Sequence, residues 1–278
     1  MTANEDWISA TIIEDSDEEI IEIIPKAKPK IRKTKVNANI ELIEEKEVKK
    51  KSVSTGLKQY FNESLSIYEI GIDEAGRGPM FGRVYAGAVI LPKDNPNFKF
   101  DWLKDSKKFH SKKKIEQVAD YIKENALAWA VEFEDEQTID EINILQATQS
   151  AMHKAIKNVL GKLDNNVIFD NILLLVDGNY FKSYTTINKS KTKLETIKHL
   201  LVEGGDNKFC AIAAASILAK VERDKYIEDL CVQNPELIEY YGIDSNKGYG
   251  SKKHLDGIKE HGITKWHRKT FGICKQFA

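Results

Sequence analysis

The chain has 278 residues, of which 41% are hydrophobic and 31% charged, and its formal net charge is −1. This length suffices for one large globular domain or two small ones. The three cysteines, Cys210, Cys231 and Cys274, form no CxxC pair, which argues against a disulfide framework and a cysteine zinc site. No apolar run approaches the ~20 residues that span a bilayer. The beginning MTANEDWISA lacks the regions of a secretory signal. We therefore expect an intracellular, cytoplasmic protein without membrane contact.

Residues 1–66 differ from the rest of the chain. Eight acidic residues precede residue 26, and the stretch KAKPKIRKTK (26–35) then carries six basic ones. Such blocks of one charge without a helical or strand period predict a disordered extension. Its basic block is typical of a nucleic-acid contact or a nuclear address, so a nuclear or viral setting stays open beside a cytoplasmic one.

Within this extension, residues 54–61 show a spacing of apolar residues that the rest of the extension lacks. Leu57, Tyr60 and Phe61 are spaced i, i+3, i+4, so one helical turn would place them on one side. This arrangement resembles the short peptide by which replication and repair enzymes dock on the sliding clamp, with Ser54 where that motif usually has glutamine. Alternatively, Ser54 caps a short helix that packs onto the domain.

From residue 67 onward, predicted strands and helices alternate, which indicates an α/β domain. The strands are expected from their β-branched and aromatic residues, and the first helix from its apolar face and the capping Ser111. The predicted strands are 66–73, 83–91, 126–134, 171–178 and 196–206, and the predicted helices are 111–125, 138–160 and 209–230.

Four carboxylates stand at the ends of predicted strands. Asp73 and Glu74 end the first strand, Asp177 ends NILLLVD, and Asp206 closes LVEGGD. Ligands of α/β sheets collect at the carboxyl ends of strands. Acids that converge there repel one another unless a cation joins them, and Mg²⁺ and Mn²⁺ prefer oxygen ligands. For each acid alone, a solvent-facing turn explains the position equally well.

The glycine-rich stretch GRGPMFG (76–82) has the spacing of a dinucleotide fingerprint. That fingerprint requires a helix directly afterwards. Here Pro79 and the predicted strand 83–91 follow instead, so we reject the dinucleotide interpretation.

Basic residues cluster in two places. The stretch 104–114 holds six lysines and a single acid, and 247–275 holds eight Lys or Arg and two acids, with Tyr249 and Trp266 among them. Together with the acids these runs predict a metal site beside a phosphate-binding groove. A solvated face accounts for several of the lysines, and core packing for Trp266.

The chain resembles the ribonuclease HII family. The resemblance covers essentially all of 67–278, and DEAGRGP together with AASILAKVERD makes it specific. The matching stretches are GIDEAGRGP, DSKK (105–108), IDEINIL (139–145), LLVDGN, GGD, AAASILAKVERD (213–224), NKGYGSKKHL (246–255) and HGITKWHRKTFG (261–272).

The resemblance implies a ribonuclease H-like α/β fold with a mixed central sheet flanked by helices and a helical C-terminal part. It makes Asp73, Glu74, Asp177 and Asp206 the catalytic, metal-binding carboxylates, with two ions of Mg²⁺ or Mn²⁺ expected. The residues that it implies for substrate binding are the sensors of the ribose 2′-hydroxyl, Gly76, Arg77 and Gly78; the tyrosine that packs on the following deoxyribose, Tyr249; and the phosphate contacts Ser106, Lys107 and Asn143.

The implied activity is endonucleolytic hydrolysis of RNA in RNA–DNA hybrids and incision at ribonucleotides embedded in duplex DNA, by a monomer. Two alternatives are a catalytically silent module that binds hybrids and a nuclease restricted to long hybrids. The presence of all four carboxylates disfavours the first alternative, and Tyr249 with the glycine loop disfavours the second. One position departs from the family pattern, because Gly204 stands where family members often have lysine.

Overall fold

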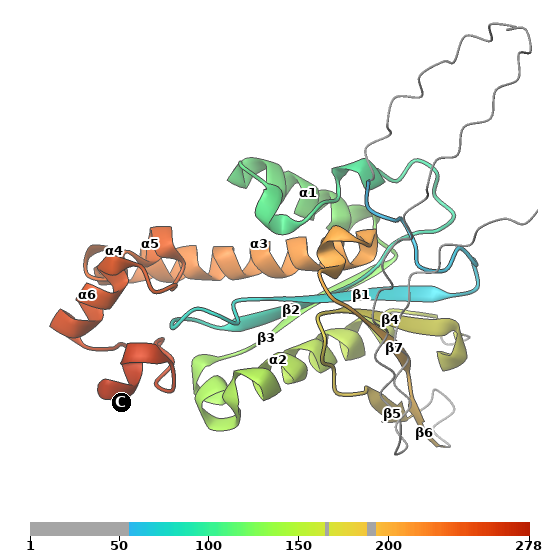
Figure 1. Ribbon diagram of the computed structural model, residues 1–278. Coiled ribbons are helices and arrows are strands. Elements are labelled where there is room, and N and C mark those ends of the chain that lie inside the picture. The colour runs from blue at the N-terminus through green and yellow to red at the C-terminus, as the bar shows by residue number, and fades with distance from the viewer. Residues whose placement is uncertain (1–55, 165–166, 188–192) are drawn as a thin grey trace, which may run out of the picture. The chain divides into compact units, whose positions relative to one another are not determined.

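The computed structural model describes residues 56–164, 167–187 and 193–278, so Ser54 and the charged blocks of the extension lie outside the described residues. A five-stranded sheet has the order β3-β2-β1-β4-β7 (Figure 1). Its strands are β1 (Tyr68–Ala75), β2 (Val84–Ile90), β3 (Ala128–Glu134), β4 (Ile172–Asp177) and β7 (Lys198–Val202). The central β1 pairs antiparallel with β2 and parallel with β4. The predicted mixed α/β sheet is confirmed.

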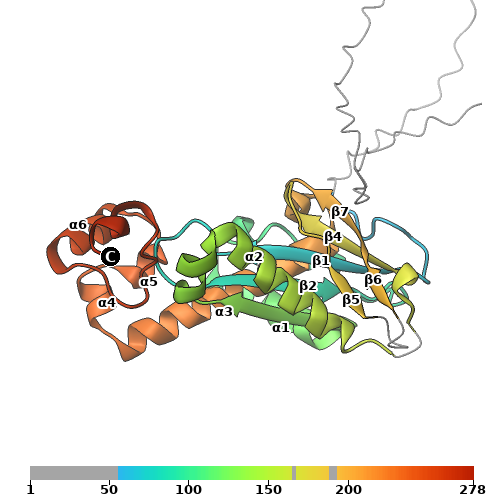
Figure 2. The same ribbon diagram turned by 90° about the horizontal axis from the view of Figure 1, so that it is seen from below.

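Three long helices cover the two faces of the sheet. Helix α2 (Glu136–Leu160) lies on one face, and α1 (Lys112–Asn125) and α3 (Cys210–Gln233) lie on the other (Figure 1). Figure 2, seen from below, shows α2 crossing in front of β1 and β2. Each face has its own buried apolar cluster, one shared with α2 and the other with α1 and α3. Burial of these apolar faces is the main force that holds the layers together.

Helix α3 lies unusually close to the sheet because both surfaces carry small residues. A Cβ atom added to Gly71 on β1 would lie 2.1 Å from the carbonyl carbon of Ala211, and one on Gly87 of β2 would lie 2.4 Å from the oxygen of Ala215. The small residues Ala211 and Ala215 of α3 permit this close packing. This contact also brings Ser216 of α3 over the end of β1.

The C-terminal part is helical, as expected, and packs on the far end of α3. It contains α4 (Glu236–Glu239), α5 (Ile243–Asn246) and α6 (Lys252–His261). Phe81, from the glycine loop, is fully buried in the apolar cluster of this part. Trp266 lies against it, with 6.4 Å between the ring centroids, which confirms the core-packing alternative for this tryptophan. Among the described residues, no helix is both long and apolar enough to cross a bilayer.

Several element boundaries differ from the predicted ones. The strand expected over 196–206 ends at Val202, because Gly204 adopts a left-handed conformation with φ 61° that turns the chain. Asp206 therefore lies in a short 3₁₀ helix, η4 (Gly205–Asn207), and not on a strand. Among the described residues, four further 3₁₀ turns and a small hairpin were not predicted: η1 (Phe100–Trp102), η2 (Ser106–Lys108), η3 (Phe169–Asn171), η5 (Gly272–Gln276), and β5 (Thr185–Ile187) with β6 (Leu194–Thr196).

Helix α2 begins at Glu136, two residues before the predicted start. The Asp135 side chain caps it by accepting a 2.8 Å hydrogen bond from the Thr138 amide, as acidic N-caps do. Asn143 interrupts the helix with φ 66° and ψ 163°. Its side chain then accepts a 3.1 Å hydrogen bond from the Gln146 amide and so caps the second segment.

Residues 57–61 form no helical turn, although their spacing predicted one. Lys58 instead pairs with Phe209 in a β-bridge, because its amide donates to the Lys208 carbonyl at 2.8 Å and its carbonyl accepts from Cys210. The Tyr60 hydroxyl donates to the Pro92 carbonyl at 3.0 Å. Phe61 lies against Phe209, with 5.9 Å between the ring centroids. This segment packs on the domain as an extended chain.

Candidate active site

The four predicted carboxylates lie at one end of the sheet. Asp73 and Glu74 belong to the last residues of β1, and Asp177 ends the parallel neighbour β4. Asp177 Oδ1 accepts a 2.6 Å hydrogen bond from the Gly205 amide, which ties β4 to the turn that carries Asp206. Asp73 and Asp206 are 5% and 4% exposed. The convergence expected from the sequence is present.

These carboxylates destabilise one another's ionised forms. Burial raises the pKa of Asp73 well above its ordinary value, and the charges of Glu74 and Asp177 raise it further. Burial also raises the pKa of Glu74 and that of Asp177, to which Asp206 adds. Acids with raised pKa values are the expected result of charges gathered in a poorly hydrated place.

Two basic side chains approach the carboxylates. The Arg77 guanidinium lies 3.2 Å from Glu74 Oε1, and the Lys107 ammonium lies 3.7 Å from Asp206 Oδ2 while its side chain stays 81% exposed. Although burial opposes the shift, Asp206 and Asp105 raise the pKa of Lys107. Both cations are therefore held on the solvent side of the acidic cluster.

The donor set fits a hard divalent cation in its chemistry. Within the described ranges, no three His, Cys, Asp or Glu side chains are gathered tightly enough to be a ready-made metal site. The acids nevertheless supply carboxylate oxygens, the ligands that Mg²⁺ and Mn²⁺ prefer. A cation would also relieve the repulsion that raises the pKa values of Asp73, Glu74 and Asp177.

The glycine loop directly after β1 is held from inside the protein by Arg268. This side chain is 0% exposed and donates to the carbonyls of Gly76 at 2.6 Å, Pro79 at 2.7 Å and Gly82 at 2.8 Å. A fourth bond reaches the Arg77 carbonyl at 3.1 Å. Burial and the nearby Arg223 lower the pKa of Arg268 to about 9, so it stays charged at neutral pH.

Arg223 of α3 supports the same loop from a second direction. It donates to the Phe81 carbonyl at 3.3 Å and to the Lys247 carbonyl at 2.9 Å. Gly76 has φ 90°, and a Cβ atom there would lie 2.2 Å from Arg223 Nε. Glycine is therefore required at this position both by conformation and by space.

A groove of about 420 Å³ joins these parts. The predicted residues that line it are Glu74, Gly76, Arg77, Gly78, Ser106, Lys107 and Tyr249. Tyr249 is 52% exposed, and its Cε1 would lie 3.4 Å from a Cβ atom built on Gly78. Asn143 is absent from the described lining and has the helix-capping contact given above. The structure thus brings together all predicted substrate residues except Asn143.

Sequence reasoning missed several residues of the groove. Its lining also includes Ser216, Lys220, Arg223, Asp224, Ser245, Asn246 and Lys247. The first three are spaced i, i+4, i+7 in AAASILAKVERD and so share one face of α3. That polar stripe begins in the apolar first half of α3, and it was a signal from which these residues could have been found.

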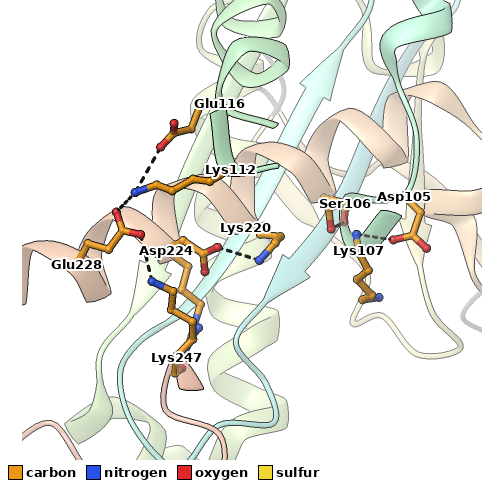
Figure 3. A network of polar contacts seen from close by, with 11 residues as sticks. Asp105, Ser106, Lys107, Lys112, Glu116, Lys220, Asp224, Glu228 and Lys247 are labelled. Atoms are coloured by element: carbon orange, nitrogen blue, oxygen red, sulfur yellow. Dashed lines mark hydrogen bonds and ion pairs between the residues drawn. The ribbon is translucent and has the colours of Figure 1, made fainter. Parts of the chain in front are cut away.

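Ion pairs hold the basic side chains along this groove (Figure 3). Lys220 pairs with Asp224 at 2.8 Å on α3, and Lys247 pairs with Glu228 at 3.1 Å. Lys112 of α1 also contacts Glu228, so this carboxylate joins α1, α3 and the residue after α5. The two basic runs of the sequence thus meet at one acid of α3.

The fold is that of known ribonucleases. The ribonuclease HII of Archaeoglobus fulgidus, solved as a complex with PCNA, matches with a TM-score of 0.54 and 22% identity over 74% of this chain and 96% of that one. Bst ribonuclease HIII, solved in complex with Mn²⁺, matches with a TM-score of 0.56 and 19% identity over 76% of this chain and 69% of that one. These likenesses show that the chain has a ribonuclease H-like fold.

The sequence defines the family. The ribonuclease HII family model matches residues 70–274. The ribonuclease HII of Bacteroides thetaiotaomicron is 43% identical over 217 residues, which cover 78% of this chain and 94% of that protein. The chain belongs to the ribonuclease HII family, and it is a ribonuclease and a hydrolase.

Proposed function

We propose that the chain incises duplex DNA at embedded ribonucleotides and hydrolyses the RNA of RNA–DNA hybrids, leaving 5′-phosphate and 3′-hydroxyl ends. Membership in the ribonuclease HII family supports the general activity, an endoribonuclease that acts on RNA–DNA hybrids. The observation that carries the finer proposal is the glycine loop, held by Arg268 beside the carboxylates.

The loop is the proposed sensor of the ribose 2′-hydroxyl. Its carbonyls at Gly76, Pro79 and Gly82 bond to Arg268 on the protein side, so the loop keeps its shape without substrate. Its glycines leave room for a sugar to approach the main chain, and the 2′-hydroxyl is the group that distinguishes RNA from DNA at one position. A preformed loop loses little conformational entropy on binding.

Asp73, Glu74, Asp177 and Asp206 are the proposed ligands of two divalent ions, Mg²⁺ or Mn²⁺. Such ions supply a water of lowered pKa as nucleophile and stabilise the leaving 3′-oxygen. Lys107 and Arg77, on the solvent side of these acids, would bind the phosphates next to the cleaved bond. Ser106 and Tyr249 line the same groove, and the tyrosine ring would pack on the deoxyribose that follows the ribonucleotide.

The test is incision of a DNA duplex that contains one ribonucleotide, with Mg²⁺ or Mn²⁺ added. We expect Asp73→Asn to fall below about one-thousandth of the wild-type rate, because several kcal/mol of barrier lowering depend on the held ions. Asp170→Asn is the matched control, since this exposed acid lies before the opposite end of β4. Undiminished incision by Asp73→Asn, or none by the wild type, would contradict the proposal.

A nuclease restricted to long hybrids remains the second candidate, supported by the general family activity alone. The same assay on a uniform RNA–DNA hybrid separates the two. If the wild type cleaves the hybrid and leaves the single ribonucleotide intact, the second candidate holds. A protein that binds both substrates and cleaves neither would be a silent binding module.

We also propose that residues 54–61 bind a sliding clamp during ribonucleotide and primer removal in DNA replication and repair. The support is the spacing of Leu57, Tyr60 and Phe61 and the complex with PCNA formed by the Archaeoglobus fulgidus relative. Because Tyr60 and Phe61 contact Pro92 and Phe209 of the domain, the segment would have to leave the domain before the clamp could bind it.

A further inference from the structure

Asn207, which no family motif pointed to, contacts two carboxylates at once. Its Nδ2 atom donates to Asp206 Oδ1 at 3.0 Å and to Asp105 Oδ2 at 3.1 Å. Its Oδ1 atom accepts a hydrogen bond from the Lys108 ammonium. All three partners are ionisable side chains, and a hydrogen bond to such a group is stronger when the group is charged.

Chemistry determines the orientation of this amide. An amide nitrogen only donates and a carboxylate only accepts, whereas an ammonium only donates. A flipped Asn207 would place its oxygen against Asp105 and Asp206 and its nitrogen against Lys108, so each contact would become repulsive. The amide therefore uses both of its N–H groups to join the two acids.

Asp105 is itself held in place, so it can anchor Asp206 through Asn207. It is buried, and its Oδ1 atom accepts a 2.9 Å hydrogen bond from the Lys107 amide as the N-cap of the 3₁₀ helix η2 (Ser106–Lys108). Asp206 lies in the turn η4, far from η2 in the sequence. Asn207 and Lys107 thus hold the two oxygens of Asp206 from the side of η2.

No other side chain of the turn around η4 is placed to orient Asp206. Gly204, before η4, contributes none, and a Cβ atom built there would meet nothing within 4 Å. The side-chain support for Asp206 comes instead from Asn207 of the turn and from Lys107 of η2.

We propose that Asn207 is a positioning residue that orients Asp206 toward the other three carboxylates for binding of the divalent ions. The inference rests on the proposed function, because it takes Asp206 as a metal ligand. Asn207 itself would touch neither ion nor substrate. Outer hydrogen-bond partners of metal ligands act in this way by fixing the ligand's orientation.

The test is Mn²⁺ binding to the substrate-free protein, measured by calorimetry and by the electron paramagnetic resonance signal of free Mn²⁺. We expect Asn207→Ala to weaken Mn²⁺ binding about tenfold, the lower end of what loss of such a partner costs. The incision rate at saturating Mn²⁺ should stay within about threefold of the wild type, since the ligand itself is retained. Asn95→Ala is the control, because Asn95 makes a local bond to the Asn97 amide away from the acids.

A second variant keeps the proposal open to refutation if Asn207→Ala folds poorly. Asp105→Asn removes the charge to which Asn207 is tied and leaves Asn207 in place. It should weaken Mn²⁺ binding by a similar factor, and the double variant should be no weaker than either single one. Unchanged Mn²⁺ binding by Asn207→Ala, or additive losses in the double variant, would overturn the inference. Absence of Mn²⁺ binding by the wild type would instead remove the proposed function.

Discussion

The glycine loop 76–82 and the turn 203–208 both follow strands that lead to the acidic cluster, yet they are held in opposite ways. Arg268 holds the loop from the interior, where it is 0% exposed. The turn is held at its surface by the exposed side chains of Asn207 and Lys107 and by the β-bridge between Lys58 and Phe209.

The loop and the turn therefore differ in how freely each can move. A loop whose carbonyls are bonded to a buried cation cannot move without leaving unpaired polar groups, which suits the proposed role of this loop as a sensor of the ribose 2′-hydroxyl. A turn held by solvent-exposed contacts can adjust at low cost. The orientation of Asp206 in this turn therefore depends on its contacts with Asn207 and Lys107.

The largest expected effect concerns the rigid loop. Arg268→Ala would leave four loop carbonyls without their donor, and we expect a loss of about 3 kcal/mol or more in the free energy of unfolding. Arg268→Lys should recover little, because lysine lacks the planar fork that reaches several carbonyls. Denaturant unfolding measures both, with Lys269→Ala, an exposed neighbour, as the control. An Arg268→Ala protein as stable as the wild type would show that Arg268 does not hold the glycine loop rigidly.

The next effect concerns discrimination at the groove. Tyr249→Ala should lower incision at a single ribonucleotide about tenfold relative to cleavage of a uniform RNA–DNA hybrid, since stacking of a ring on nucleic acid contributes about 1–3 kcal/mol. Tyr249→Phe keeps the ring and should keep the preference. Equal losses on both substrates would show that the ring does not read the junction.

A smaller effect follows from the raised pKa of Asp73. The folded protein binds this proton more tightly than the unfolded chain, so stability without divalent ions falls as pH rises from 3.8, the ordinary value, through the raised folded pKa. Asp73→Asn removes this loss of stability at rising pH, because asparagine does not titrate. In EDTA at neutral pH we expect a higher melting temperature than for the wild type, by about 2–4 °C for each kcal/mol.

The control for this prediction is pH itself. At a pH below both pKa values Asp73 is protonated in either state, so the two melting temperatures should converge. Excess Mn²⁺ should stabilise the wild type more than the variant, since ions that bind only the folded state stabilise it. A lower melting temperature for Asp73→Asn in EDTA at neutral pH would contradict the repulsion described here.

The smallest effect concerns the segment that borders the adjustable turn. Tyr60→Ala/Phe61→Ala should weaken binding to an immobilised sliding clamp, with PCNA and bacterial clamps tested in parallel, and leave incision unchanged. Melting temperature is the necessary control, because both rings contact the domain. Equal clamp binding by both proteins would remove the clamp proposal. Altered incision without a change in clamp binding would show that the segment supports the turn instead.

Much of the fold and most of the site could be predicted because their signals are local. The alternation of apolar strands and amphipathic helices predicted the α/β sheet, and Ser111 caps α1 as expected. Asp206 was expected at a strand end but lies in η4, since the left-handed Gly204 ends β7 early. The extended course of residues 57–61 was not predicted, because the bridge to Phe209 outweighs the helical spacing of their side chains.

The sequence by itself determined which residues are the candidates for the chemistry, since the carboxylates and the glycine loop lie in short continuous motifs. Only the tertiary structure decided what holds them. Arg268 bonds to Gly76 from 192 positions away, and Asn207 joins Asp206 to an acid 102 positions away. Patterns of hydrophobicity and turn residues specify local backbone states. The partner of a buried charge depends instead on how distant elements pack, and nothing in the local sequence records that.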